Sequence, residues 1–178
     1  MRFALPFLLA LAACAVEPVE SAPAPLMPLE PMVLASAPVA DTRAHPLVVV
    51  DAELADAVSQ ALALWTEATG GRYAPRLVIG DDSTAAAVRI RLVGDLDCDG
   101  VYAWACWARR SGVLEISRNA APDMVVSSIA HEIGHTLGLE HGCDGLMSLD
   151  RSNAERRAPC VSAGNVAAAG FAGPGACL

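Results

Sequence analysis

The sequence predicts an α+β fold: a twisted mixed sheet of about five strands, two main helices and a short irregular C-terminal subdomain. Two observations lead to this prediction. Apolar residues recur at helical spacing in two long segments, and short runs rich in Val, Ile and Leu lie around and between them. Apolar residues make up 54% of the chain and aromatic residues only 4%, so the core must consist mainly of Ala, Val, Leu and Ile.

The first half of the domain is expected to contain one helix among several strands. Asp51 is a favourable N-cap for that helix, and Gly70 and Gly71 would end it, because glycine readily adopts the left-handed conformation of a helix C-terminus. In the last strand of this half, apolar residues alternate with arginines, as in a strand with one buried face. The expected elements are a strand at 47–50, a helix at 52–68 and strands at 76–79 and 87–93.

The second half adds two strands and the second helix. Strands are expected at residues 101–108 and 113–117. Pro122 suits the first turn of a helix, and the helical pattern continues to about Leu139. The chain then becomes rich in turns, and the Ala- and Gly-rich tail from Pro159 is expected to be mobile unless disulfides fix it.

The N-terminus has the pattern of an export signal. A positive start is followed by an apolar run that is too short to span a bilayer and ends in Leu-Ala-Ala-Cys at Cys14. This ending resembles the lipobox of bacterial lipoproteins, in which the cysteine receives a diacylglycerol and becomes the new N-terminus. The resemblance implies a lipid-anchored protein of the bacterial cell envelope. The alternative is an ordinary secretory signal, which would leave the protein secreted and Cys14 incidental.

The chain therefore divides into three parts. The second part is rich in proline, which favours an extended, semi-rigid tether over helix or central strand. The predicted parts are a lipoprotein signal at residues 1–14, a tether at 15–44 and a catalytic domain at 45–178. The formal net charge of -8 excludes a nucleic-acid partner, because phosphate binding requires a basic surface. We expect a monomer.

Export into an oxidising compartment would allow the cysteines to pair. Besides Cys14 there are five cysteines, an odd number, so at least one has no partner within the chain. The preferred pairs are local in sequence, with Cys177 as the alternative partner of Cys143. These pairs are Cys98–Cys106 and Cys143–Cys160.

The second helix carries a motif that favours a metal site, HEIGH at residues 131–135. His131 and His135 are four residues apart and share one helical face, so both imidazoles can bind one ion. Glu132 is placed to accept a proton from metal-bound water. Gly138 can end the helix and turn the chain, so that His141 returns as a third nitrogen ligand. Three protein ligands leave one position open, which is typical of catalytic rather than structural zinc.

The alternative is that these histidines simply pack in the core. However, three of the four histidines of the chain fall within eleven residues, with Glu and Gly at the positions that such a site requires. This spacing favours a Zn²⁺ site.

The string from His131 to His141 resembles the long zinc motif of the metzincin metallopeptidases, and CDGLMS at 143–148 is similar to their Met-turn, with Met147 beneath the metal. Further likeness to matrixin-type catalytic domains extends over roughly residues 45–150. The resemblance implies a zincin/metzincin-like fold and a zinc metalloendopeptidase that hydrolyses protein or peptide substrates with a zinc-activated water and Glu132 as base. In that family an upper strand lines the cleft and pairs with the substrate, and Ala103–Ser111 is the candidate for it; the preferred interpretation of this stretch is that its tryptophans are core and rim residues of a strand. Gly142, after the third histidine, departs from the usual residues of the metzincin subfamilies.

Two other functions stay open on the sequence. One is a surface zinc-binding or adhesion module with little catalysis, and the other is a zinc hydrolase of a non-peptide envelope bond. Asp95, Asp97 and Asp99 also copy the first half of a calcium loop, which gives Ca²⁺ as an alternative ligand. Its twelfth position is Cys106 instead of glutamate, so a solvated acidic turn is the preferred interpretation.

Overall fold

The computed structural model describes residues 42–43, 45–80, 87–142, 144–148 and 158–177. The predicted signal with Cys14, nearly all of the tether, and Cys143 lie outside these residues. Within the described part of the chain, no helix has both the length and the apolar character needed to cross a bilayer.

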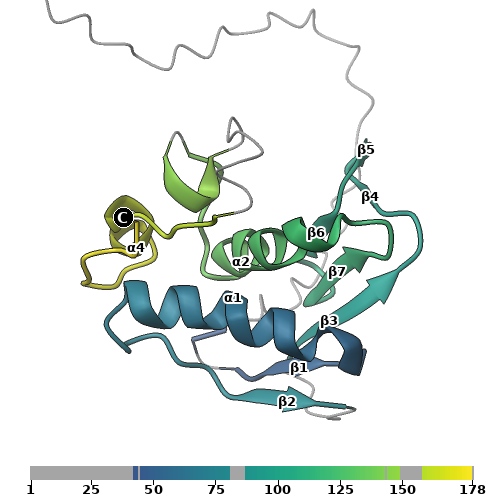
Figure 1. The fold of residues 1–178 in the computed structure, drawn as a ribbon, viewed down its shortest axis with the longest axis horizontal. Coiled ribbons are helices and arrows are strands. Elements are labelled where there is room, and N and C mark those ends of the chain that lie inside the picture. Colours follow the sequence, from purple (N-terminus) through teal and green to yellow (C-terminus); the bar gives the residue numbers. More distant parts are fainter. Residues whose placement is uncertain (1–41, 44, 81–86, 143, 149–157, 178) are drawn as a thin grey trace, which may run out of the picture. The chain divides into compact units, whose positions relative to one another are not determined.

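The described residues form a mixed five-stranded sheet in the order β2-β1-β3-β7-β6 (Figure 1). The first four strands of this order run parallel, whereas β6 pairs antiparallel with β7 and forms one edge. The strands are β1 (Leu47–Val49), β2 (Leu77–Ile79), β3 (Val88–Val93), β6 (Ala105–Ala108) and β7 (Val113–Ser117). The predicted α+β class with a mixed sheet of five strands and two main helices is confirmed.

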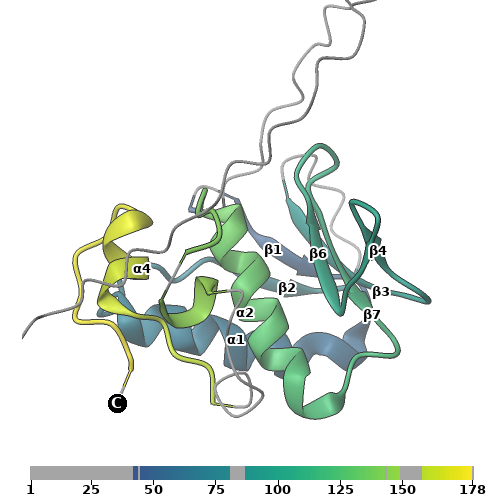
Figure 2. The same cartoon turned by 90° about the horizontal axis from the view of Figure 1, so that it is seen from above.

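The two main helices pack against each other and share one core with the sheet (Figures 1 and 2). Each begins with a short 3-10 turn. The helical elements are η1 (Ala52–Leu54), α1 (Ala55–Ala68), η2 (Pro122–Met124) and α2 (Val125–Thr136). Trp65 of α1 is fully buried, and its Nε1 donates a hydrogen bond to the Ala130 carbonyl of α2 at 2.9 Å. This bond fixes α1 beside the helix that carries the predicted metal ligands.

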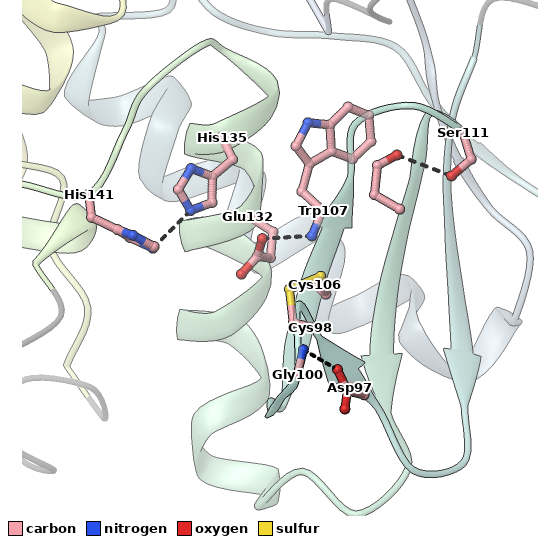
Figure 3. Close-up of a disulfide and its surroundings, with 10 residues drawn as sticks. Asp97, Cys98, Gly100, Cys106, Trp107, Ser111, Glu132, His135 and His141 are labelled. Atoms are coloured by element: carbon pink, nitrogen blue, oxygen red, sulfur yellow. Dashed lines mark hydrogen bonds between the residues drawn. A yellow bond between two sulfur atoms is a disulfide. The ribbon is translucent and has the colours of Figure 1, made fainter. Parts of the chain in front are cut away.

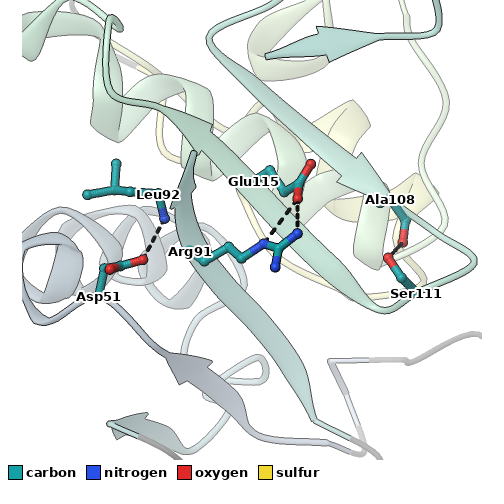
Figure 4. A network of polar contacts seen from close by, with 6 residues as sticks. All are labelled: Asp51, Arg91, Leu92, Ala108, Ser111 and Glu115. Atoms are coloured by element: carbon teal, nitrogen blue, oxygen red, sulfur yellow. Dashed lines mark hydrogen bonds and ion pairs between the residues drawn. The ribbon is translucent and has the colours of Figure 1, made fainter. Parts of the chain in front are cut away.

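The outer face of β3 and β7 is polar, as the alternating pattern predicts. Arg91 and Glu115 are register partners, and Arg91 Nε donates to Glu115 Oε1 at 3.0 Å (Figure 4). Asp51 occupies the N-cap position of η1, as predicted, but its side chain makes no capping hydrogen bond. Its carboxylate instead accepts a hydrogen bond from the Leu92 N–H at 2.7 Å, at a level of β3 where β1 has already ended.

The strand predicted at 101–108 is divided in two. Its first part, β5 (Val101–Tyr102), pairs antiparallel with β4 (Asp97–Cys98) in a hairpin of its own. The connecting residues Asp99 and Gly100 have φ values of 55° and 86°, which fits the two-residue turn typical of hairpins. The predicted Cys98–Cys106 disulfide is confirmed and joins this hairpin to β6.

The C-terminal tail is ordered by packing that its composition does not suggest. Helix α4 (Ala163–Ala168) begins at Ser162, whose side chain accepts a hydrogen bond from the Asn165 N–H in a capping box. Val161 and Val166 are fully buried. The tail is therefore part of the fold.

The predicted Cys143–Cys160 pair is wrong, because Cys160 is bonded to Cys177. After α4 the chain turns back, and the Ala176 N–H donates to the Val161 carbonyl at 2.8 Å. This contact lies one residue inside each cysteine and brings the two together, with a Cα–Cα distance of 4.8 Å. The sequence-local choice failed because it did not anticipate α4.

Thr42 and Arg43, the first two described residues, contact the rest of the domain. The Thr42 hydroxyl is fully buried and lies 2.9 Å from both the Thr136 Oγ1 and the Tyr73 hydroxyl. Arg43 donates hydrogen bonds to the Leu137 and Ala169 carbonyls. These contacts fasten the start of the described chain to the end of α2.

Replacing Cys160 and Cys177 together by serine is expected to lower the free energy of unfolding by about 3 kcal/mol, because the bond closes a loop of sequence separation 17. Thermal melting followed by circular dichroism should show a fall of roughly 10 °C. Cys143→Ser is the matched control and should change the melting temperature far less. A Cys143–Cys160 peptide in a digest of the unreduced protein would contradict the observed pairing.

Candidate metal centre

The end of α2 shapes the site. The helix ends at Thr136, earlier than predicted, and Gly138 has φ 86°, the left-handed conformation expected for it. The Leu139 N–H donates to the Gly134 carbonyl at 3.1 Å and the Gly138 N–H to the His135 carbonyl at 3.0 Å. This pair of bonds is a Schellman motif, which closes the helix and turns the chain back toward it.

His131, His135 and His141 come together as predicted. One ligand nitrogen from each can be chosen so that all lie within 4.8 Å of one another. The Nε2 atoms of His135 and His141 are 3.2 Å apart (Figure 3). Two nitrogens bound tetrahedrally to one zinc ion lie roughly 3.3 Å apart, so the spacing of this pair suits a shared metal ion.

Two backbone carbonyls orient the first two imidazoles. His131 Nδ1 lies 2.8 Å from the Leu146 carbonyl, and His135 Nδ1 lies 2.7 Å from the Leu139 carbonyl. A carbonyl only accepts hydrogen bonds, so each Nδ1 carries the proton and each Nε2 offers a lone pair to a metal. Burial lowers the pKa of His135, which favours the neutral form that binds metals.

Glu132 lies within the same cavity and is 8% exposed. Its Oε2 accepts a hydrogen bond from the Trp107 N–H of β6 at 2.9 Å (Figure 3). Burial raises the pKa of this carboxyl to about 7, although the hydrogen bond from Trp107 opposes the shift. The bond holds the carboxylate between α2 and the edge strand.

The Trp107 N–H is available because of the strand register. The Ser117 N–H donates to the Trp104 carbonyl at 2.8 Å, and antiparallel pairs alternate between residues bonded across the ladder and residues that point away. Ala105 and Trp107 therefore direct their peptide groups to the free edge of β6. Both residues line the cavity.

The segment expected to form the Met-turn lies beneath α2. Met147 belongs to η3 (Gly145–Met147) and is 1% exposed. A Cβ at Gly134 would overlap the Met147 sulfur and press on the Trp65 ring. The glycine at the fourth position of the HEIGH motif therefore permits Met147 to approach the helix backbone between the two histidines.

Asn165 is a site residue that sequence reasoning missed. It is 5% exposed, and its Oδ1 accepts a hydrogen bond from the Leu146 N–H at 3.0 Å. The carbonyl of Leu146 is the group that orients His131. The tail thus supports a metal ligand through one residue of η3. The spacing of Ser162 and Asn165 resembles a capping box, and this pattern in the sequence could have predicted that α4 begins there.

The cavity around these groups has a volume of about 960 Å³. It extends from the histidines along β6 to the β4–β5 hairpin. Its lining includes His131, Glu132, His135, Leu139, Glu140, His141 and Ser148 on one side, and Val101, Tyr102, Ala103, Trp104, Ala105, Trp107 and Arg109 on the other.

The calcium alternative is not supported. Among the residues that the structure describes, the three histidines are the group of His, Cys, Asp or Glu that could hold a metal ion, and the three aspartates form no such group. Asp97 accepts a hydrogen bond from the Gly100 N–H within the hairpin turn, and Asp95 accepts one from Asn119 Nδ2. The acidic turn is therefore a structural feature of the hairpin.

No protein-family model matches the chain, and no curated protein matches it either.

Asn165→Ala is expected to weaken zinc binding about tenfold or more, because the buried Leu146 N–H would lose its acceptor and His131 its fixed orientation. Competition with a chromogenic chelator measures this affinity. Asn165→Asp keeps the acceptor and should restore most of it, and Asn119→Ala is the control for an exposed asparagine. If Asn165→Ala lowers the melting temperature but leaves the zinc affinity unchanged, Asn165 stabilises the tail and does not support the metal ligand.

Proposed function

We propose that this protein is a metzincin-like zinc metalloendopeptidase. The observation that carries the proposal is a buried carboxylate in the same cavity as three converging imidazoles. Bound zinc would supply Lewis acidity, which polarises a peptide carbonyl and makes a nearby water more acidic. His131, His135 and His141 would hold the ion, each as a neutral nitrogen donor.

Glu132 acts as the general base. The Trp107 N–H holds Oε2, which leaves Oε1 to accept the proton of the attacking water. The same carboxyl then delivers that proton to the leaving amine. The hydrogen bond to the rigid edge strand keeps the carboxylate in one place through both transfers.

An extended peptide fits the cavity as substrate. Strand β6 is the edge of the sheet, and the peptide groups of Ala105 point to its free side, whereas the Trp107 N–H is bonded to Glu132 and the Trp107 carbonyl to the Arg109 N–H. A substrate backbone placed there can add to the sheet by main-chain hydrogen bonds, which recognise any extended peptide. This arrangement favours a peptidase over a hydrolase of a non-peptide envelope bond.

A surface zinc-binding or adhesion module is the second candidate. Metal binding alone needs the three histidines and not Glu132. Burying a carboxylate costs free energy unless it is compensated, so its place beside the metal ligands favours catalysis.

Glu132→Gln is expected to reduce cleavage of a diverse peptide mixture by roughly 10²- to 10⁴-fold while zinc affinity is retained, because the amide keeps the acceptor for Trp107 but cannot take a proton. Mass spectrometry of the products measures cleavage.

Glu140→Gln is the control: it removes an exposed charge from the same cavity and should alter the rate only a few-fold. A chelator should abolish cleavage by the wild type. Normal turnover by Glu132→Gln would remove Glu132 from the mechanism, and no cleavage by the wild type would favour the adhesion module.

We also propose that the domain is anchored to the bacterial envelope through a lipid at Cys14, on the strength of the lipobox-like sequence. Expressed in a bacterium that processes lipoproteins, the wild type should sediment with membranes, and Cys14→Ser should not. Cys143→Ser is the control and should behave as the wild type. A mature N-terminus at any other residue, found by mass spectrometry, would contradict the anchor.

A further inference from the structure

The cavity along β6 has charged side chains at both of its ends. At one end, the turn of the β4–β5 hairpin contributes Asp99. At the other end, directly after the last residue of β6, Arg109 lines the cavity. Figure 3 shows the hairpin and the turn that contains Ser111 at opposite ends of this strand. The two ends of the cavity therefore differ in the sign of the charge that they present.

Arg109 is available to bind a ligand. Among the described side chains that line the cavity, it is the one that always carries a positive charge. It is exposed, and it forms no ion pair and no side-chain hydrogen bond with a residue that the structure describes. A guanidinium group has planar pairs of N–H donors that match the two oxygens of a carboxylate. The ligand that suits this position is therefore a carboxylate.

The backbone that carries Arg109 is fixed by short-range hydrogen bonds. The Arg109 N–H donates to the Trp107 carbonyl at 3.0 Å, and the Ser111 N–H donates to the Ala108 carbonyl at 3.0 Å. The Ser111 hydroxyl donates to the same carbonyl at 3.1 Å (Figures 3 and 4). The turn is therefore formed before any substrate binds, which limits the entropy lost on binding to the side chain of Arg109.

We propose that Arg109 binds a carboxylate of the substrate, so that the protein prefers peptides with an acidic group on one side of the scissile bond. The proposal rests on the endopeptidase function above and adds its substrate class. Asp99 repels the same group at the hairpin end, which confines the preference to the side that lies toward the β6–β7 turn. An acidic side chain and the C-terminus of a peptide both present this group.

Glu140, on the opposite wall of the cavity, acts against Arg109. Besides burial, which lowers the pKa of His135 most, Arg109 lowers this pKa and Glu140 raises it. Both charges therefore lie near the same part of the cavity. Since both side chains are exposed, water and salt weaken their interactions with a substrate. The preference for an acidic group is consequently moderate and depends on ionic strength.

The test uses peptides that are blocked at both ends and carry either Glu or Gln at one position at a time around the cleaved bond. For the wild type, kcat/KM should be about fivefold or more higher with Glu on one side of the bond, and not on the other. Raising the salt concentration from about 0.02 M to about 0.5 M should reduce this Glu/Gln ratio. A second set, with Gln and a free C-terminus, shows whether the chain end supplies the carboxylate instead.

Arg109→Gln should reduce the Glu/Gln ratio to about one, and Arg109→Lys should retain part of it because the positive charge remains. Arg110→Gln is the matched control and should leave the ratio unchanged, since it removes an exposed arginine of the same turn that does not line the cavity. Glu140→Gln should raise the ratio, because it removes the opposing charge. The melting temperatures should equal that of the wild type, because all three side chains are exposed.

If neither the Glu/Gln ratio nor the response to a free C-terminus changes in Arg109→Gln, while cleavage continues, the binding of carboxylates by Arg109 is overturned and the endopeptidase function stays intact. A wild type that cleaves the peptides without preferring either form of carboxylate would have the same consequence. Absence of cleavage of every peptide by the wild type would overturn both.

Discussion

The site depends on the close approach of Met147 to the backbone of α2 at Gly134. Without it, η3 would lie farther from the helix, and the Leu146 carbonyl would not reach His131. The same glycine also accepts the hydrogen bond from the Leu139 N–H that closes the helix. One residue without a side chain thus serves both the packing beneath the ligands and the turn that leads to the third ligand.

Two parts of the chain that are distant in sequence make the site rigid. On one side, β6 presents the Trp107 N–H to Glu132, and a disulfide fixes the hairpin before it. On the other side, α4 presents Asn165 to η3, and a second disulfide closes the loop that contains α4. The metal-bearing helix lies between these two supports. A small core with few aromatic residues is compensated at the site by covalent and polar contacts.

Much of this arrangement follows from local patterns in the sequence. The strand at 113–117, the alternation in β3 and the ligand spacing at 131–135 were predicted because each depends on neighbours within a few residues. The mixed sheet of five strands and the Cys98–Cys106 bond were also confirmed. Local rules succeed when the contact that fixes an element lies nearby in the chain.

The failures arose where a distant contact decided the structure. The Asp51 carboxylate accepts a hydrogen bond from the Leu92 N–H of β3 and none from the helix that follows it, because that N–H lies beside it. The tail was expected to be mobile unless disulfides fixed it, and the Cys160–Cys177 bond does so, although Cys143 was the expected partner of Cys160. The order of the tail also comes from Val161 and Val166 packed in the common core, and from Gly173, where a Cβ would overlap the Ala68 carbonyl oxygen at the end of α1. Neither contact can be inferred from composition.

The buried position of Thr42 limits where a protease can cut the N-terminal part of the chain without disturbing the fold. A protease needs several residues in extended form in its active site, and Thr42 is enclosed by Tyr73 and Thr136. Cleavage is therefore confined to sites upstream of Thr42. A chain cut upstream of Thr42 would keep the hydroxyl network at the end of α2, so the shortened form would retain the same support for the helix as the full chain.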